Sequence, residues 1–511
     1  MAADASGALF LAGRQPGAGS VGSATGGTGG TGSTGGTARA AHAARPALRT
    51  RAVLRRAAPL LPAIAVVALL AVPATPSGDG SGGSGTVADL ASALLVLHCL
   101  VRVLRERARP LTRTAALVLG LPVLGVTVAA ITSHDPASSL PGVARYLQIF
   151  VLVPAALLLL LRDRADFRFV AGSVVALALV EGAVGVVQYL TGTGASYMGE
   201  NIRAVGTFGP SDVMGMATVV AFGLIIAIGF ALGMDGDHGG AAPRGQRVVA
   251  LVCAGLLSVP LVLSFSRGAW IATAAAVVLQ LALSGPRRAA RIVLAAGALG
   301  VVLVGGLGIG SQMVTERLDS ITRVTDAPDR SVTDRYTMWA AATGMWQERP
   351  LTGVGLKGFP AYRDSHASLA LSSASDTAGA GQGFQRQPLL SPHNMYLLVL
   401  SEQGLLGLTA LVGSWAALLV CALRGLSGAR RSRRGADCGL VVIGLLVCQL
   451  VNFSYGDIGG PSTVLTAVMF GLAAWWGLGS GRDGSRDQVR SRNQVRSPDP
   501  GRRVNEGTAS A

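Results

Sequence analysis

Charged residues are scarce in this chain of 511 residues, and lysine is almost absent. Only 14% of the residues are charged, whereas half are hydrophobic, a balance that argues against a soluble domain. Lys357 is the only lysine, so arginine carries nearly all of the positive charge. The apolar residues come in blocks of roughly 20, the length that crosses a hydrocarbon core of about 30 Å. The sequence therefore predicts an all-α polytopic membrane protein.

The chain also lacks the usual patterns of a metal or redox site. Its five cysteines lie in or beside apolar blocks, and no CxxC or Cys/His spacing occurs, so small buried cysteines are expected. Asp235-Gly236-Asp237 resembles the metal-binding Asp-x-Asp of nucleotide-sugar enzymes. It falls in a short linker on the side expected to be cytoplasmic, so we do not interpret it as a metal site. Neither a metal nor a cofactor is predicted.

About twelve apolar segments predict transmembrane helices. They lie near residues 57–73, 86–104, 114–132, 144–161, 169–190, 212–233, 247–265, 268–284, 290–309, 394–422, 438–455 and 461–479. The resulting organisation is a disordered tail (1–56), nine helices (57–309), one large loop (310–393), three helices (394–480) and a second disordered tail (481–511). The tails are polar or low in complexity and cannot bury enough apolar surface to fold alone.

The arginines test this count. They cluster in the first tail, in the connections after the second, fourth, sixth, eighth and tenth segments, and in the last tail. Cytoplasmic connections carry such an excess, so both termini are predicted to be cytoplasmic and the loop 310–393 extracytoplasmic. That loop holds eight acidic and eight basic residues. Because the net charge of +16 follows membrane orientation, nucleic acid is not expected as a partner.

Three arginines stand out on the extracytoplasmic side. Arg203 precedes the sixth segment, Arg267 begins the eighth, and Arg335 begins a helical pattern over residues 331–348. A cation is disfavoured at a helix N-terminus, and a bound phosphate reverses that penalty. By placement alone, snorkelling to lipid headgroups, or ion pairing at the surface, is the favoured reading of such arginines.

His393 and Asn394 follow Ser391-Pro392, which reads as an N-cap and a first helical turn. His393 is therefore expected on the opening turn of the tenth helix, where a neutral imidazole can accept a proton from an attacking hydroxyl. A structural histidine is the alternative. Glu402, further down the same segment, and Glu181 in the fifth are interpreted as partners of buried polar groups.

Two stretches of the large loop carry weaker signals. Thr352 to Phe359 is rich in glycine but lacks the spacing of a nucleotide-binding loop, so a tight turn is expected. Ala367 to Gly383 is rich in serine, alanine and glycine and is expected to be flexible.

Several of these motifs follow one another along the chain in a defined order. They are Ser266-Arg267-Gly268-Ala269-Trp270, Arg335 with Trp339, Pro350-Leu351-Thr352-Gly353-Val354-Gly355 followed by Phe359, Pro392-His393-Asn394, and Glu402-Gln403-Gly404-Leu405-Leu406-Gly407. In this order and spacing the chain resembles the O-antigen ligase and O-antigen polymerase superfamily, over roughly 140–479 and most clearly over 260–410.

The resemblance implies a GT-C-like membrane glycosyltransferase in the cell membrane, surrounded by membrane lipids. Its donor would be a glycan linked to polyprenyl diphosphate, and its acceptor a hydroxyl of a glycan, lipid or protein. By the resemblance, Arg267 and Arg335 hold the diphosphate with Arg203, and His393 activates the acceptor or orients the reacting groups. Asn394 and Glu402 are supporting residues, and the mechanism is inverting and independent of metal.

The shared motifs leave alternatives open. A ligase, a chain polymerase and a protein O-oligosaccharyltransferase of this superfamily are not separated by them. Two readings of other classes also remain: a transporter, which needs charged or broken helices at the membrane midplane, and a scaffold without catalysis.

Overall fold

The computed structural model describes twelve stretches of the chain. They are residues 58–73, 86–106, 111–133, 135–197, 200–212, 214–233, 244–301, 330–368, 375–379, 382–387, 389–432 and 435–479. The two predicted tails, the Asp235-Gly236-Asp237 linker and residues 310–329 of the large loop lie outside them.

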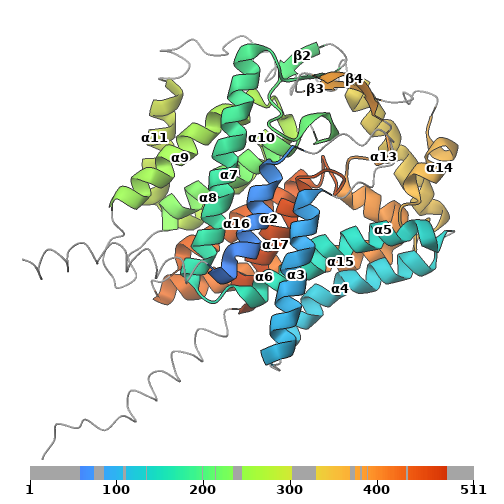
Figure 1. Cartoon of the computed structure of the whole chain (residues 1–511), viewed down its shortest axis with the longest axis horizontal. Coiled ribbons are helices and arrows are strands. Elements are labelled where there is room, and N and C mark those ends of the chain that lie inside the picture. Colours follow the sequence, from blue (N-terminus) through green and yellow to red (C-terminus); the bar gives the residue numbers. More distant parts are fainter. Residues whose placement is uncertain are drawn as a thin grey trace, which may run out of the picture. The chain divides into compact units, whose positions relative to one another are not determined.

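Helices occupy the positions of the predicted segments (Figure 1). Before the large loop they are η1 (Ala58–Leu60), α2 (Leu61–Ala68), η2 (Leu69–Ala71), α3 (Val87–Glu106), α4 (Arg113–Ile131), α5 (Pro136–Leu147), η3 (Gln148–Leu152), α6 (Val153–Leu160), α7 (Arg164–Thr191), η4 (Gly209–Asp212), α8 (Gly215–Gly233), α9 (Arg244–Leu263), α10 (Arg267–Ser284) and α11 (Pro286–Val301). Within and after the loop they are α13 (Arg330–Glu348), α14 (Phe359–His366), α15 (Met395–Ser432), α16 (Ala436–Asn452) and α17 (Thr463–Gly479).

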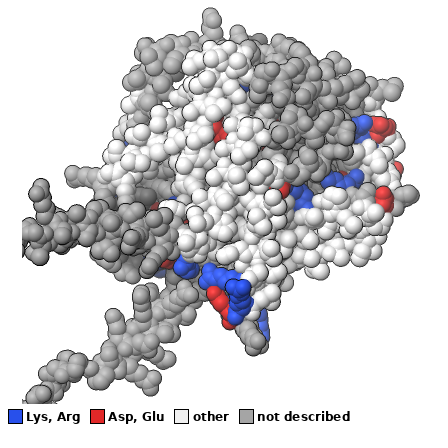
Figure 2. Space-filling view, viewed as in Figure 1, with Lys and Arg blue, Asp and Glu red and all other residues white. Residues whose placement is uncertain are grey.

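In the described part of the chain, eight helices are long and apolar enough to cross a membrane. Three shorter apolar helices, over Ala58–Ala71, Ala436–Asn452 and Thr463–Gly479, also coincide with predicted segments. Large apolar side chains on α3, α4, α7 and α9 are exposed, and Figure 2 shows wide uncharged surface with charged side chains in small groups. The chain is therefore a polytopic membrane protein, whereas the count of twelve spans stays a prediction.

α8 is the most enclosed of these helices. It is buried over almost its whole length, between α7, α9, α10 and α16. Small residues permit the close approach: Gly223 lies against Ala178 of α7, and Gly233 lies against Asp437 of α16. Without a hydrophobic driving force between helices in lipid, close backbone packing of this kind is a main source of their association.

An aromatic cluster joins α15, α16, α17 and η3. Trp415 of α15 stacks on Phe453, with ring centroids 5.0 Å apart, and on Phe470 of α17 at 6.0 Å. Phe150 of η3 packs against Trp415 at 5.7 Å. Since Phe453 directly follows α16, this cluster anchors the start of the connection that leads from α16 to α17.

α15 is longer than the predicted segment 394–422 and is broken at Gly404, whose φ of 63° and ψ of −165° are not helical. The Gly-rich turn of the large loop fills the break. The N–H of Val354 donates to the carbonyl of Ser401 at 2.8 Å, and the N–H of Leu405 donates to the carbonyl of Pro350 at 2.9 Å. The turn was predicted, but its role is to replace hydrogen bonds that α15 loses, as backbone inside a membrane protein requires.

A small sheet departs from the all-α prediction. Its strands are β1 (Ala195–Tyr197), β2 (Glu200–Arg203), β3 (Ser375–Gly379) and β4 (Gln382–Gln387), in the order β2-β1-β3-β4 and antiparallel throughout. The expectation that residues 367–383 form only a flexible insert is therefore wrong for the strand residues. Pairing of β1 with β3 places this insert beside the segment that leads to Arg203.

Alternate connections meet at opposite ends of the helices. We call one of these ends the site end. It holds the connections after α7, α9 and α16 and the start of α15. Hydrogen bonds join these segments: the N–H of Ala204 donates to the carbonyl of Leu263 at 3.3 Å, and the N–H of Met395 donates to the carbonyl of Phe453 at 2.8 Å. At the opposite end, Arg168 of α7 pairs with Asp437 of α16 at 2.7 Å.

Candidate functional site

The predicted site residues Arg203, Arg267 and His393 all lie at the site end. Arg203 ends β2, Arg267 begins α10, and His393 lies just before α15. Arg335 lies in the first turns of α13, which packs against α15. Each of these side chains is neither fully buried nor fully exposed. The structure therefore gathers on one end residues that are spread over 190 positions of sequence.

The segments of Arg203 and Arg267 are packed together. The N–H of Ala204 donates to the carbonyl of Leu263, the last residue of α9. Ser266 caps α10, because its Oγ accepts from the N–H of Ala269 at 3.2 Å. The predicted helix N-terminus at Arg267 is thus confirmed.

Glu181 secures the segment that follows Arg203. One carboxylate oxygen accepts from the N–H of Thr207 at 2.8 Å and the other from its Oγ1 at 2.7 Å. Gln188 accepts from the N–H of Gly206 at 2.9 Å and donates to its carbonyl at 2.8 Å. The interpretation of Glu181 as a partner of buried polar groups is confirmed.

His393 is placed differently from the prediction. α15 begins at Met395, and its cap is Asn394, whose Oδ1 accepts from the N–H of Leu397 at 3.1 Å. The prediction of Ser391 as N-cap and of His393 on the first turn is therefore wrong. Asn394 supplies the cap oxygen itself, so the helix starts later and His393 stays in the preceding turn.

Backbone strain marks the same region. In the described residues, three that are not glycine have positive φ: Phe265 at 48°, Lys357 at 61° and His393 at 48°. Phe265 precedes Arg267 by two positions, and Lys357 belongs to the Gly-rich turn. Bulky residues rarely adopt this conformation, and it persists where the surroundings impose it, which is common at functional sites.

α13 approaches His393 from the large loop. Trp339 donates its indole N–H to the carbonyl of Pro392 at 2.9 Å. Arg335 lies four positions earlier, on the same face of the helix. The helix predicted over residues 331–348 is confirmed. The hydrogen bond from Trp339 holds this helix against the turn that carries His393.

The connection between α16 and α17, residues 453–462, links these parts, and the sequence analysis missed it. The N–H of Met395 donates to the carbonyls of Phe453 (2.8 Å) and Gly456 (3.1 Å). The Tyr455 side chain packs on Gly268, where a Cβ would lie only 3.2 Å from it. This connection therefore touches both the start of α10 and the start of α15.

Asp457 is the functional candidate on this connection. Its Oδ2 lies 4.0 Å from Nδ1 of His393 and accepts a hydrogen bond from Oγ of Ser391. Its Oδ1 accepts from the N–H of Gly459 at 3.1 Å. The only available signal was a lone acidic residue in a turn rich in glycine, and such a signal does not indicate which residue it faces.

The surroundings favour the neutral form of His393. Burial lowers the pKa of His393 below its usual value, the Asp457 carboxylate opposes this shift, and the Arg335 guanidinium adds to it. The imidazole keeps 45% of its side-chain surface accessible. A neutral, accessible imidazole is the form that can accept a proton.

Glu402 supports the large loop rather than His393. Its Oε1 accepts from the N–H of Phe359 at 3.2 Å, and its carbonyl accepts from the N–H of Gly355 at 3.1 Å. Both bonds hold the Gly-rich turn against the break in α15. Among the described residues, no group of three His, Cys, Asp or Glu side chains is placed to hold a metal ion.

Residues 252–412 match the family described as O-antigen ligase. This segment includes Arg267, Arg335 and His393, so the resemblance to the O-antigen ligase and polymerase superfamily is confirmed there. Comparison of the chain with curated proteins returned no match.

Proposed function

We propose that this chain, which matches the O-antigen ligase family over residues 252–412, is a GT-C-like glycosyltransferase of cell-surface polysaccharide biosynthesis. It transfers a glycan from a polyprenyl-diphosphate donor to an acceptor hydroxyl of a glycan, lipid or protein. The reaction takes place at the extracytoplasmic face of the cell membrane, and both termini are cytoplasmic.

One observation carries this proposal: His393 lies in a strained turn where an anion and a cation from different parts of the chain both act on its charge. Asp457 follows α16, and Arg335 belongs to α13. The connection that holds Asp457 also contacts Gly268, next to Arg267. A base and a cationic group for a leaving diphosphate thus share one end of the helices.

In the proposed reaction, neutral His393 takes the proton of the acceptor hydroxyl. The acceptor oxygen bonds to the anomeric carbon as the bond from that carbon to the diphosphate oxygen breaks. The diphosphate leaves with the electron pair, and the guanidinium groups of Arg267 and Arg335, with Arg203, stabilise its charge. Attack opposite the leaving group inverts the configuration, and no metal is required for charge neutralisation.

The test is glycan transfer by the purified full-length protein in liposomes that contain an oligosaccharide linked to polyprenyl diphosphate. His393→Gln removes the base, and Arg267→Gln or Arg335→Gln removes a cation, so each is expected to lower the rate at least 100-fold. His366→Gln is the matched control. It removes another imidazole of the large loop, which pairs with Glu348 and has no assigned role in transfer. Full activity in the three variants contradicts the residue roles.

The transporter alternative has one feature in its favour, the break in α15 at Gly404. Backbone of the Gly-rich turn fills this break through hydrogen bonds to Ser401 and Leu405, so the break is explained by loop docking. Movement of the lipid-linked glycan across the liposome membrane, without any transfer to acceptor, supports the transporter instead.

A further inference from the structure

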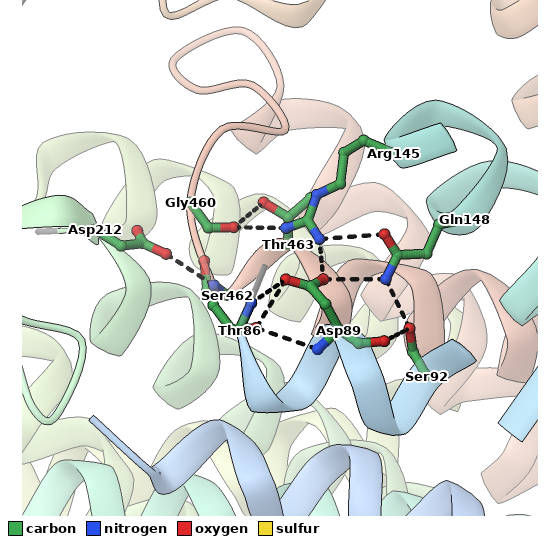
Figure 3. Close-up of polar contacts among 9 residues, drawn as sticks. All are labelled: Thr86, Asp89, Ser92, Arg145, Gln148, Asp212, Gly460, Ser462 and Thr463. Atoms are coloured by element: carbon green, nitrogen blue, oxygen red, sulfur yellow. Dashed lines mark hydrogen bonds and ion pairs between the residues drawn. The ribbon is translucent and has the colours of Figure 1, made fainter. Parts of the chain in front are cut away.

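The connection that carries Asp457 is held by a polar network outside the residues assigned so far. Its centre is Gly460, three positions after Asp457. The carbonyl of Gly460 accepts from Nη2 of Arg145 at 3.1 Å and from Oγ1 of Thr463 at 2.6 Å. Figure 3 shows Arg145 reaching this carbonyl from another helix. The polar end of α5 therefore contacts the loop between α16 and α17.

Arg145 is itself fixed in place. Its Nη1 pairs with the carboxylate of Asp89 on α3 and lies 3.2 Å from Oε1 of Gln148. Gln148 donates to Asp89 at 3.0 Å, and Thr86 donates to the other carboxylate oxygen through its N–H and its Oγ1, both at 2.8 Å. With these partners the Arg145 guanidinium has little freedom to turn away from Gly460.

A second contact reaches the connection from the segment that follows Arg203. Oδ2 of Asp212 accepts from the N–H of Ser462 at 2.9 Å, as drawn in Figure 3. Gly460 packs so closely on this carboxylate that a Cβ there would overlap it. Burial raises the pKa of Asp212, the hydrogen bonds from Ser462 lower it, and the charges of Asp457 and Arg145 act in opposite directions.

We propose that Arg145 and Asp212 are positioning residues that hold the 453–462 connection and thereby place the Asp457 carboxylate beside His393. They do not touch the reacting groups, and they act through Asp457. The inference rests on the proposed function only for its effect on transfer, since the placement of Asp457 is a property of the protein alone.

The electrostatics of His393 make this measurable. Among the described charged groups, those that shift its pKa by charge are Asp457, from the connection, and Arg335, from α13. Arg145 and Asp212 are not among them. A change in the pKa of His393 on mutating either residue therefore reports displacement of Asp457.

The experiment is an NMR titration of the full-length protein with ¹³C-labelled histidine in lipid nanodiscs, in which His393→Gln identifies the His393 signal. Asp457→Asn is expected to lower the pKa of His393 by about 1, because it removes a nearby anion. Arg145→Gln and Asp212→Ala are expected to lower it in the same direction by a smaller amount. Asp212→Asn retains an oxygen that can accept from Ser462, so the pKa stays near the wild-type value.

Arg168→Gln is the matched control. It breaks the Arg168–Asp437 pair at the opposite end of α16, about 24 Å along that helix, and leaves the pKa of His393 unchanged. If it destabilises the protein as much as Arg145→Gln does, general loosening of the fold is not the cause of the shift.

Two results overturn the inference. One is a wild-type pKa of His393 in both Arg145→Gln and Asp212→Ala. The other is a shift that Arg145→Gln produces equally in the Asp457→Asn background, where no carboxylate remains to be displaced. If instead the wild-type protein transfers no glycan while the pKa shifts occur as expected, the proposed function fails and the positioning role stands.

Discussion

The protonation state of the His393 imidazole depends on nearby charges and on burial, and the backbone of this residue is strained. A carboxylate lies 4.0 Å from its Nδ1, a guanidinium acts on it from α13, and its backbone is held at positive φ. The anion stabilises the protonated ring, whereas the cation and burial destabilise it. The balance favours a neutral base at neutral pH.

The pH dependence of transfer follows from these signs. Because protonated His393 cannot accept a proton, kcat/KM is expected to rise as the pH increases through a value below about 6.5, the usual pKa of histidine. Asp457→Asn removes the stabilising anion and moves this midpoint to lower pH. Arg335→Gln removes a cation and moves the midpoint of its residual activity to higher pH. Each of the two shifts is expected to be roughly 1 pH unit.

The measurement is the pH–rate profile of transfer in liposomes. Asp364→Asn is the control, since Asp364 pairs with Arg363 on the exposed side of α14. Midpoints that move in the same direction in Asp457→Asn and Arg335→Gln rule out the assigned electrostatics.

At the scale of elements, α15 depends on a segment that is remote in sequence. Its two halves are joined at Gly404, and the Gly-rich turn bonds to both sides of the break. Glu402 adds a carboxylate contact to the same turn. The large loop is thus attached to the transmembrane region at this break and, through Trp339, at the His393 turn.

Gly404→Ala is expected to destabilise the protein. The φ and ψ of Gly404 suit only glycine, and a Cβ would overlap the backbone of Leu351 and Thr352. We expect a loss of roughly 2 kcal/mol or more in the free energy of unfolding, seen as a lower Tm in detergent. Gly413→Ala is the control: it lies in the same helix with no atom within 4 Å of an added Cβ, and alanine favours helix by about 1 kcal/mol. Equal Tm values for the two variants contradict the role of the break.

For the whole molecule, the two ends of the helices differ in chemistry. The site end holds the four candidate residues and the Asp457 connection. The opposite end holds the arginines at the starts of α7 and α9. One of them, Arg168 of α7, pairs there with Asp437 of α16. By the positive-inside rule, we propose that the opposite end faces the cytoplasm.

Cysteine labelling tests this orientation. In a variant without the five native cysteines, Asp364→Cys is expected to react with a membrane-impermeant maleimide in intact cells, because Asp364 is 77% exposed on the large loop. Glu106→Cys, at the opposite end of α3 and also exposed, is expected to react only after permeabilisation. The reverse pattern places the site in the cytoplasm.

The sequence alone determined the membrane class, the approximate helix positions, the helix predicted over residues 331–348, the start of α10 at Arg267 and the place of Arg203 in a connection. These features depend on hydrophobic runs, arginine clusters and cap residues, which are local in sequence. Only the tertiary structure decided the break at Gly404, the β1–β3 pairing and the contact of Asp457 with Ser391, 66 positions away. Such pairings depend on how helices pack, and a lone aspartate in a short turn carries no local signal of the residue that it faces.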